Sequence, residues 1–275
     1  MITKFDPKDL SKLYKPDNNS TKTENGQVTV IAGSKLFHGP PLMILKVASR
    51  LVDMVFLASP EPSVGRTAEN LKSQLSSFIW TPWADLESYI EKSDACLIGP
   101  GLMRYGGDSG QGTGDRLDTE GEKTKEITER LLKKFKNKKW VIDGGSLQVM
   151  DAEWIPEGAI LTPNQKEYQI LFKNMDIESA SKKYKCVIVL KGAVTIVSSQ
   201  NKTVEVYGGN AGLTKGGTGD VEAGLTTALL AKNDPFLAAT VGSYITKLAA
   251  DNLFKKVGFE YNSDDLANEI PQILR

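Results

Sequence analysis

The feature that most constrains the fold is a series of short β-branched runs that alternate with longer stretches of helical character. Each run is apolar on both faces and stops at a small or turn-forming residue. Strands of this kind must be covered on both sides, and helical crossovers between them favour a parallel or mixed sheet. The expected buried strands span residues 28–33, 52–59, 95–99, 140–145, 159–162 and 186–192.

The remaining segments complete this βαβα pattern. Residues 193–199 and 203–209 predict a late hairpin, and the C-terminal third predicts two long helices and a short one. Further helices are expected over residues 41–49, 120–135 and 165–172. The sequence therefore predicts an α/β fold with three layers, in which helices cover both faces of a mostly parallel sheet. Polar, glycine-rich composition predicts an N-terminal arm over 1–25, one domain over 26–275 and a surface loop over 105–123.

Charge and cysteine usage exclude several classes of partner. The 34 basic and 34 acidic residues cancel, so no general field recruits nucleic acid or an anionic membrane. No apolar run has the length of a membrane span and the N-terminus lacks a secretory signal, which predicts a soluble, cytoplasmic protein. Cys96 and Cys186 lie in apolar stretches, where buried free thiols are expected rather than a disulfide or a metal site.

Unusual segments follow the carboxyl ends of the expected strands. In an open α/β sheet, ligands bind at that edge because crossover loops and helix N-termini meet there. Each segment could be an ordinary turn, since Gly and Pro punctuate every such fold, but their common edge predicts a binding site. In chain order the segments are GSKLFHGPP, GPGL, DGGS, TPNQKE, KGAVT and GGTGD.

The tetrapeptide GTGD occurs twice, at residues 112–115 and 217–220. A phosphate needs several unpaired amides aimed at one place, and a glycine-rich turn that opens a helix supplies them. After Asp220, apolar residues recur at helical spacing, whereas the residues after Asp115 are polar and interrupted by Gly121. We therefore expect the second copy to bind phosphate and the first to form a flexible loop, with a mobile lid as the alternative.

Asp220 itself has two interpretations. As a helix N-cap it would stabilise the following helix by about 1 kcal/mol without any chemistry. Beside amides that bind phosphate, its carboxylate could instead take a proton from a hydroxyl that attacks a phosphoryl group. The residues alone leave both interpretations open.

The segment YGGNAGLTKGGTGDVEAGL resembles the signature N-x-G-M-A-x-G-G-T-G-D-V-L-A-G of the ribokinase-like NAD(P)H-hydrate dehydratases. These lyases repair hydrated nicotinamide cofactors at the expense of ATP or ADP. The segments AGSKLFHGPP, GPGL, LTPNQKEYQILF and VLKGAVTIV are similar to other family segments in the same order, over roughly residues 26–272. The resemblance implies a ribokinase-like fold and, because the chain has no room for the epimerase domain of many members, the stand-alone form.

The resemblance also implies roles for particular residues. Asp220 would activate the hydroxyl of the hydrated nicotinamide, and the phosphorylated hydrate would then eliminate phosphate to give NADH or NADPH. The substrate would also meet Pro40, Gly101 and Asn164. Nucleotide and phosphate contacts would come from Lys191, Gly192, Ala193, Val194, Thr195, Asn210, Gly216, Gly217, Thr218 and Gly219. Lys191 could otherwise be an ordinary cation at a strand end.

Asn164 and Glu167 resemble the Asn-x-x-Glu motif with which many ribokinase-like proteins organise magnesium and phosphate. Because Mg²⁺ keeps several waters, Glu167 would act on it through water. The alternative is a helix start, with Pro163 before it and Glu167 in the first turn. The family usually has His at the position of Asn164, so a hydrogen bond to substrate remains but proton transfer by this side chain is lost.

Several positions depart from the family pattern, namely Pro40, Leu213, Lys215, Glu222 and the DGGSL segment at 143–147. Lys215 could pair with a phosphate or remain solvated, and Glu222 replaces an apolar residue. Asp143 could place substrate or a metal-bound water, or cap a turn. His38 is either structural or near the substrate.

The sequence thus predicts repair of the (6S)-hydrates of NADH and NADPH with ATP or ADP and Mg²⁺. One alternative is a ribokinase-like small-molecule kinase, such as a vitamin-precursor kinase, and another is a nucleotide-binding regulatory protein without turnover. A Rossmann site is excluded, since no G-x-G-x-x-G follows the first strand. The sequence leaves open the choice of ATP or ADP, the preferred hydrate and whether the chain forms a homo-oligomer.

Overall fold

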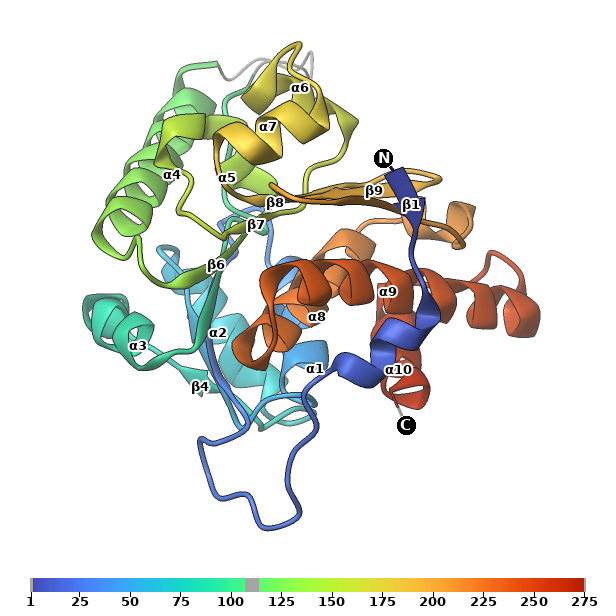
Figure 1. Cartoon of the computed structure of the whole chain (residues 1–275). Coiled ribbons are helices and arrows are strands. Elements are labelled where there is room, and N and C mark those ends of the chain that lie inside the picture. The colour runs from blue at the N-terminus through green and yellow to red at the C-terminus, as the bar shows by residue number, and fades with distance from the viewer. Residues whose placement is uncertain (1, 107–113, 275) are drawn as a thin grey trace.

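The fold is organised around one sheet, shown in the computed structural model, which describes residues 2–106 and 114–274 (Figure 1). Its strands are β1 (Ile2–Lys4), β2 (Gln27–Ile31), β3 (Met54–Ala58), β4 (Ile79–Trp80), β5 (Ala95–Ile98), β6 (Lys139–Ile142), β7 (Ile160–Leu161), β8 (Val187–Leu190), β9 (Thr195–Ser198) and β10 (Thr203–Val206). Their order in the sheet is β1-β10-β9-β8-β7-β6-β5-β2-β3-β4. Each strand expected from the sequence is present.

Strand direction places the unusual segments at one edge. The strands from β4 across to β8 are parallel to their neighbours, and β9 runs antiparallel to both β8 and β10. The predicted late hairpin is therefore confirmed as β9–β10. Because β10 runs in the same direction as β8, the segment that follows it reaches the same edge as the loops after β2, β5, β6, β7 and β8.

Helices cover both faces of the sheet. Their bounds are α1 (Gly39–Ala48), α2 (Pro62–Leu71), α3 (Leu86–Lys92), α4 (Gly114–Lys134), α5 (Gly144–Val149), α6 (Gln165–Phe172), α7 (Ile177–Lys183), α8 (Thr218–Lys232), α9 (Pro235–Val257) and α10 (Ser263–Ile273). The core on one face includes residues of α1, α2, α8, α9 and α10, and the core on the other includes residues of α3 to α7 (Figure 1). The predicted three-layer fold is confirmed. No helix of the described ranges has both the length and the apolarity needed to cross a membrane.

The expected surface loop over residues 105–123 is wrong for its second half, because α4 begins at Gly114. Of the first GTGD, Gly112 and Thr113 lie outside the described residues, but Gly114 and Asp115 open this helix. A Cβ at Gly121 would lie 2.9 Å from the backbone nitrogen of Tyr105, so this glycine permits close packing inside the helix. Tertiary contact here overrides the low helix propensity of glycine.

The first part of the N-terminal segment, residues 2–13, is attached to the domain. Ile2–Lys4 form an edge strand parallel to β10, and a 3₁₀ helix follows over Pro7–Lys12. The side chains of Phe5, Leu10 and Leu13 pack against the core. The expected polar arm therefore contributes both a strand and apolar contacts, which its overall polarity concealed.

The two thiols are free and buried, as predicted. Cys96 lies on β5, and Cys186 immediately precedes β8. Burial raises the pKa of each thiol to about 12, so neither provides a reactive thiolate near neutral pH.

Helix α8 lies at the centre of its layer between α1 and α9, and nearly all its side chains are buried. Two glycines permit this position. A Cβ at Gly224 would lie 2.9 Å from the Cα of Ile44 in α1. A Cβ at Gly242 of α9 would lie 2.5 Å from Oγ1 of Thr226 in α8. Close backbone approach on both sides therefore determines where the N-terminus of α8 lies.

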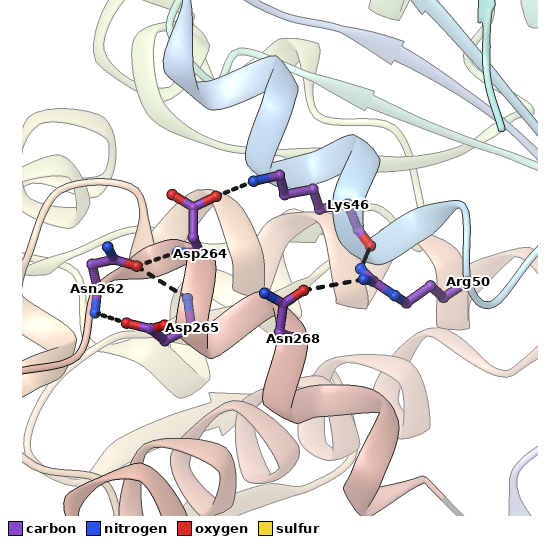
Figure 2. Close-up of polar contacts among 6 residues, drawn as sticks. All are labelled: Lys46, Arg50, Asn262, Asp264, Asp265 and Asn268. Carbon is purple, nitrogen blue, oxygen red and sulfur yellow. Dashed lines mark hydrogen bonds and ion pairs between the residues drawn. The ribbon is translucent and has the colours of Figure 1, made fainter. Parts of the chain in front are cut away.

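Polar contacts between α1 and α10 complete this layer (Figure 2). Lys46 forms an ion pair with Asp264, and Arg50 Nη2 donates to Asn268 Oδ1 over 3.1 Å. Asn262 caps α10 and accepts from the amide of Asp264 over 2.9 Å. Because these side chains are partly exposed, we expect them to orient α10 more than to stabilise it.

We predict that Gly224→Ala destabilises the protein by about 1–3 kcal/mol, although alanine favours a helix by about 1 kcal/mol. The added methyl group would meet the backbone of Ile44. The free energy of unfolding in urea measures the effect. Gly39→Ala is the matched control, because a Cβ at Gly39 meets nothing within 4 Å. A Gly224→Ala protein as stable as the wild type would contradict the packing argument.

Candidate active site

The second GTGD forms a nest of free amides at the N-terminus of α8, as predicted. Gly217 has a φ of 91°, and the helix begins at Thr218. Thr218 Oγ1 donates to the carbonyls of Leu213 and Lys215 over 2.6 and 2.8 Å, which fixes the turn. Within the described residues, the amides of Gly216, Gly217, Gly219 and Asp220 make no backbone hydrogen bond. An anion at this place would meet both these donors and the positive end of the helix dipole.

Asp220 lies in the first turn of α8, where its side chain does not cap the helix. The N-cap position is Gly217, and the helix has no side-chain cap hydrogen bond. Burial raises the pKa of Asp220 to about 7, with Asp143 and Glu167 adding to the rise and Lys191 opposing it. The capping interpretation is therefore wrong, and the carboxyl group changes its protonation state near neutral pH.

Lys191 and Asp143 form a partly buried ion pair beside Asp220. Lys191 follows β8 and Asp143 follows β6, and Lys191 Nζ lies 3.0 Å from Asp143 Oδ1. Burial alone would lower the pKa of Lys191, but Asp143, Glu167 and Glu222 raise it. Asp143 makes no side-chain cap hydrogen bond to α5, so its partner is the lysine rather than the turn. Lys191 is thus the cation within a group of buried carboxyl groups.

Asn164 and Glu167 form a capping box at the start of α6. Asn164 Oδ1 accepts from the amide of Glu167 over 3.0 Å, and Glu167 Oε2 accepts from the amide of Asn164 over 2.9 Å. Gln148 Nε2 donates to the other Glu167 oxygen over 3.1 Å. The helix-start interpretation is confirmed, while a contact between Glu167 and metal-bound water stays a prediction. In the part of the chain that the structure describes, no three His, Cys, Asp or Glu side chains are grouped to hold a metal ion.

A cavity of about 570 Å³ lies beside the N-terminus of α8, between the β8–β9 turn, the segment after β10 and α9. It brings together many of the residues predicted to bind nucleotide or substrate. These lining residues are Asn164, Lys191, Gly192, Ala193, Thr195, Asn210, Thr218 and Gly219. Gly216, Gly217 and Asp220 lie at the adjoining turn without lining this cavity, and the side chain of Val194 is exposed.

Asn210 lines the cavity, although its side chain is already hydrogen-bonded. Its Oδ1 accepts from the amide of Gly212 over 3.0 Å and from the hydroxyl of Tyr261 over 2.8 Å. Its Nδ2 donates to the carbonyl of Ala250 over 2.9 Å. Asn210 therefore shapes the cavity wall, and direct contact with a nucleotide stays a prediction.

Pro40 and Gly101 adjoin each other on the side of α8 that α1 occupies. Gly101 has a φ of 69°, and a Cβ there would lie 2.9 Å from Pro40 Cγ. Met43 of α1 also approaches the turn, since its Cγ would lie 3.5 Å from a Cβ at Gly217. The amide nest is therefore approached by α1 from one side and bordered by the cavity on another.

The side chains of Lys215 and His38 both have hydrogen-bond partners within the protein. Lys215 remains exposed, as the solvated interpretation expects, although its Nζ donates to the carbonyls of Phe259 and Tyr261. A contact of Lys215 with phosphate stays a prediction. His38 Nε2 lies 3.0 Å from Ser63 Oγ at the start of α2, which fits the structural interpretation.

Sequence reasoning missed the contribution of α9 to the cavity. Ser243, Thr246 and Lys247 line it from this helix, together with Glu222 of α8. Lys247 Nζ donates to the carbonyls of Gly192, Ala193 and Gly208 over 3.1, 2.8 and 3.0 Å. One ammonium group thus joins the β8–β9 turn to the segment after β10. The available signal was a single cation within the apolar stretch SYITKLAAD.

This sandwich, with an amide nest and a carboxyl group at the N-terminus of a buried helix, defines a ribokinase-like α/β protein. A ribokinase-like superfamily protein from Enterococcus faecalis has this fold, with a TM-score of 0.81 and 22% identity over 99% of this chain and 95% of that one. The family model described as NAD(P)H-hydrate dehydratase matches residues 28–272. The chain belongs to the NAD(P)H-hydrate dehydratase family.

Individual proteins are similar to this chain in sequence or, for the solved structure, in fold. The bifunctional NAD(P)H-hydrate repair enzyme of Methanocaldococcus jannaschii is 34% identical over 97% of this chain, which spans only 52% of that protein. The ADP-dependent (S)-NAD(P)H-hydrate dehydratase of Nitrosopumilus maritimus is 27% identical over 100% of this chain and 95% of its own length. A Bacillus subtilis ADP/ATP-dependent dehydratase co-crystallised with ATP/Mg²⁺ has a TM-score of 0.71 at 18% identity, over 99% of this chain and 97% of that one.

We predict that Asp220→Asn stabilises the protein more near pH 8 than near pH 4. The pKa of Asp220 rises from 3.8 to about 7 on folding, so wild-type stability falls as pH rises between these values. Asp220→Asn should therefore stabilise the protein by about 2 kcal/mol more near pH 8 than near pH 4. One pKa unit corresponds to about 1.4 kcal/mol, and contact of the carboxyl group with solvent keeps the effect below the full value for this change of pKa. Urea unfolding of both proteins at the two pH values measures it. An equal difference at both would contradict the raised pKa.

Proposed function

We propose that this protein dehydrates the (6S)-hydrates of NADH and NADPH, using ATP or ADP as phosphoryl donor. The observation that carries the proposal is the arrangement at the N-terminus of α8. There Asp220, whose pKa is about 7, adjoins free amides and a cavity of about 570 Å³. Family membership and the activities of the relatives named above support the choice of substrate.

Asp220 acts as the general base. Its carboxylate takes the proton from the hydroxyl of the hydrated nicotinamide as that oxygen attacks the terminal phosphoryl group. The P–O bond to the nucleotide breaks, and the amides of Gly216, Gly217 and Gly219 hold the transferring phosphoryl oxygens. The phosphorylated hydrate then loses phosphate together with a proton from the neighbouring ring atom, which restores the carbon–carbon double bond.

The two partners of the reaction approach the nest from different sides. Pro40 and Gly101 lie toward α1 and contact the hydrated nicotinamide, and Asn164 meets it from the wall of the cavity. The cavity on the other side takes the nucleotide, along Lys191 to Thr195 and Asn210. Two observations support this arrangement: the cavity reaches Thr218 and Gly219, and Met43 of α1, three residues after Pro40, approaches Gly217.

The residues present also fit a magnesium ion that accompanies the nucleotide. Burial and mutual repulsion raise the pKa of both Asp220 and Glu167, and Lys191 is the cation that opposes this rise in each. An added divalent cation would relieve this excess of negative charge. Asp143 and Glu167 would hold it through water, since Mg²⁺ keeps several of its waters. The ion would neutralise charge on the phosphates.

We treat residues 26–275 as one catalytic domain whose partners are small molecules, acting in the cytoplasm without nucleic acid or a membrane surface. The balanced charge supports the absence of polyanionic partners. Association of copies is proposed from exposed apolar side chains near the end of α9, where Phe254 and Phe259 lie with ring centroids 4.7 Å apart.

We expect Asp220→Asn to lower the rate of dehydration by about 10²–10⁴-fold and to leave the Kd for nucleotide nearly unchanged. The amide removes the proton acceptor but preserves the shape of the turn. The assay follows reduced-nicotinamide absorbance from the purified hydrate with ATP or ADP and Mg²⁺, and calorimetry measures the nucleotide Kd.

The matched control is Asp115→Asn, the same change in the first Gly-Thr-Gly-Asp, which should keep wild-type rate. Phosphate retained on an alcohol, without new absorbance, would favour a small-molecule kinase. Nucleotide binding without turnover, together with indifference to Asp220→Asn, would favour a regulatory protein. Either result rejects the proposed dehydratase.

A further inference from the structure

Glu222 is a buried carboxyl group that faces the nucleotide cavity and has no role in the mechanism above. It is 8% exposed, and it stands where the family signature has an apolar residue. Its Oε1 and the Oγ of Ser243 on the facing helix α9 are both buried, and these two side chains lie close to each other without a hydrogen bond of good geometry, among the residues that the structure describes. Both side chains line the cavity.

Such unsatisfied groups are unfavourable in a folded protein, and each calls for a partner. The nearby ammonium group of Lys247 is not that partner, because it donates to the carbonyls of Gly192, Ala193 and Gly208. Burial raises the pKa of Glu222, and Lys191 and the neighbouring hydroxyl of Ser243 oppose the rise. Both side chains retain the capacity for further hydrogen bonds. A ligand group that donates to the carboxyl oxygens and accepts from the hydroxyl of Ser243 would satisfy both residues.

The position of Glu222 along α8 indicates which part of a nucleotide it meets. Glu222 follows Gly219 by three residues, which is about 4.5 Å along the helix axis. Phosphates on the amides of Gly216, Gly217 and Gly219 place the ribose next along the ligand, with the base one group farther away. Ribose hydroxyls both donate and accept hydrogen bonds, so they match a carboxyl group and a serine hydroxyl together.

We propose that Glu222 binds the ribose hydroxyls of the phosphoryl donor and makes the site selective for ribonucleotides over deoxyribonucleotides. Ser243 supplies the second hydrogen bond from α9. This inference rests on the proposed function, because it assigns one part of the nucleotide site. It concerns binding alone, so a test of it does not need catalytic turnover.

Isothermal titration calorimetry with ADP, 2′-deoxy-ADP and 3′-deoxy-ADP in Mg²⁺ tests this assignment. The wild type should bind ADP about 10- to 100-fold more tightly than at least one deoxy analogue, as expected for loss of a hydrogen bond to a charged group. Glu222→Leu should lose most of this preference, because only the hydroxyl of Ser243 would still meet the ribose. Glu222→Gln, which keeps one acceptor oxygen, should show an intermediate preference.

The matched control is Glu269→Gln, which changes another buried carboxylate, paired with Lys256 outside the cavity, and should keep the full preference for ADP. The unliganded Glu222→Leu protein should melt at or above the wild-type temperature, because it loses an unsatisfied polar group. This melting temperature shows that the variant folds, and Glu222→Gln provides the same test with a smaller change of shape.

The possible failures are distinguishable. Tight ADP binding by the wild type without discrimination against either deoxy analogue would overturn the ribose assignment and leave the proposed function standing. Discrimination that survives undiminished in Glu222→Leu would also overturn it. No binding of ADP, ATP or either deoxy analogue by the wild type would overturn the nucleotide site itself, and with it both proposals.

Discussion

The burial of α8 between α1 and α9 is the constraint on which the rest of the site depends. Gly224 and Gly242 let neighbouring backbones approach so closely that the helix has little freedom to slide or rotate. Its first turn is therefore held rigidly at the carboxyl edge of the sheet. Free amides need a fixed direction to bind a phosphoryl group, and here the packing of three helices supplies it.

Electrostatics near that turn follow from the same burial. Asp143, Glu167, Asp220 and Glu222 interact with the ammonium group of Lys191, which cannot neutralise all four. Lys247 adds a second cation near Glu222. Burial and repulsion consequently raise the pKa of Asp220 to about 7, a value suited to a base that must accept and release a proton near neutral pH. Burying this ionised carboxyl group lowers the stability of the folded protein, and replacing it with asparagine should therefore recover stability. Structural stability and reactivity are opposed at this residue.

Local patterns predicted the parts of the structure that local physics determines. Apolar β-branched runs identified the central strands, and Pro163 with Asn164 marked the start of α6 at Gln165. The second GTGD was distinguished from the first by the apolar helix that follows it. The same reasoning failed at Gly121, because glycine has a low helix propensity. Close packing against Tyr105, which only the folded chain reveals, outweighs that propensity and keeps Gly121 inside the helix.

Residues whose roles depend on distant partners escaped prediction for a similar reason. Lys215 turns to carbonyls more than forty residues away, and Lys247 joins two loops that are separate in sequence. The cavity wall on α9 therefore could not be inferred from the motifs, which all lie in loops at the sheet edge. Because α9 also carries Ser243 opposite Glu222, the packing that positions the amide nest also builds the wall of the nucleotide cavity. A change in how α8 and α9 pack would thus alter phosphate binding and nucleotide selection together.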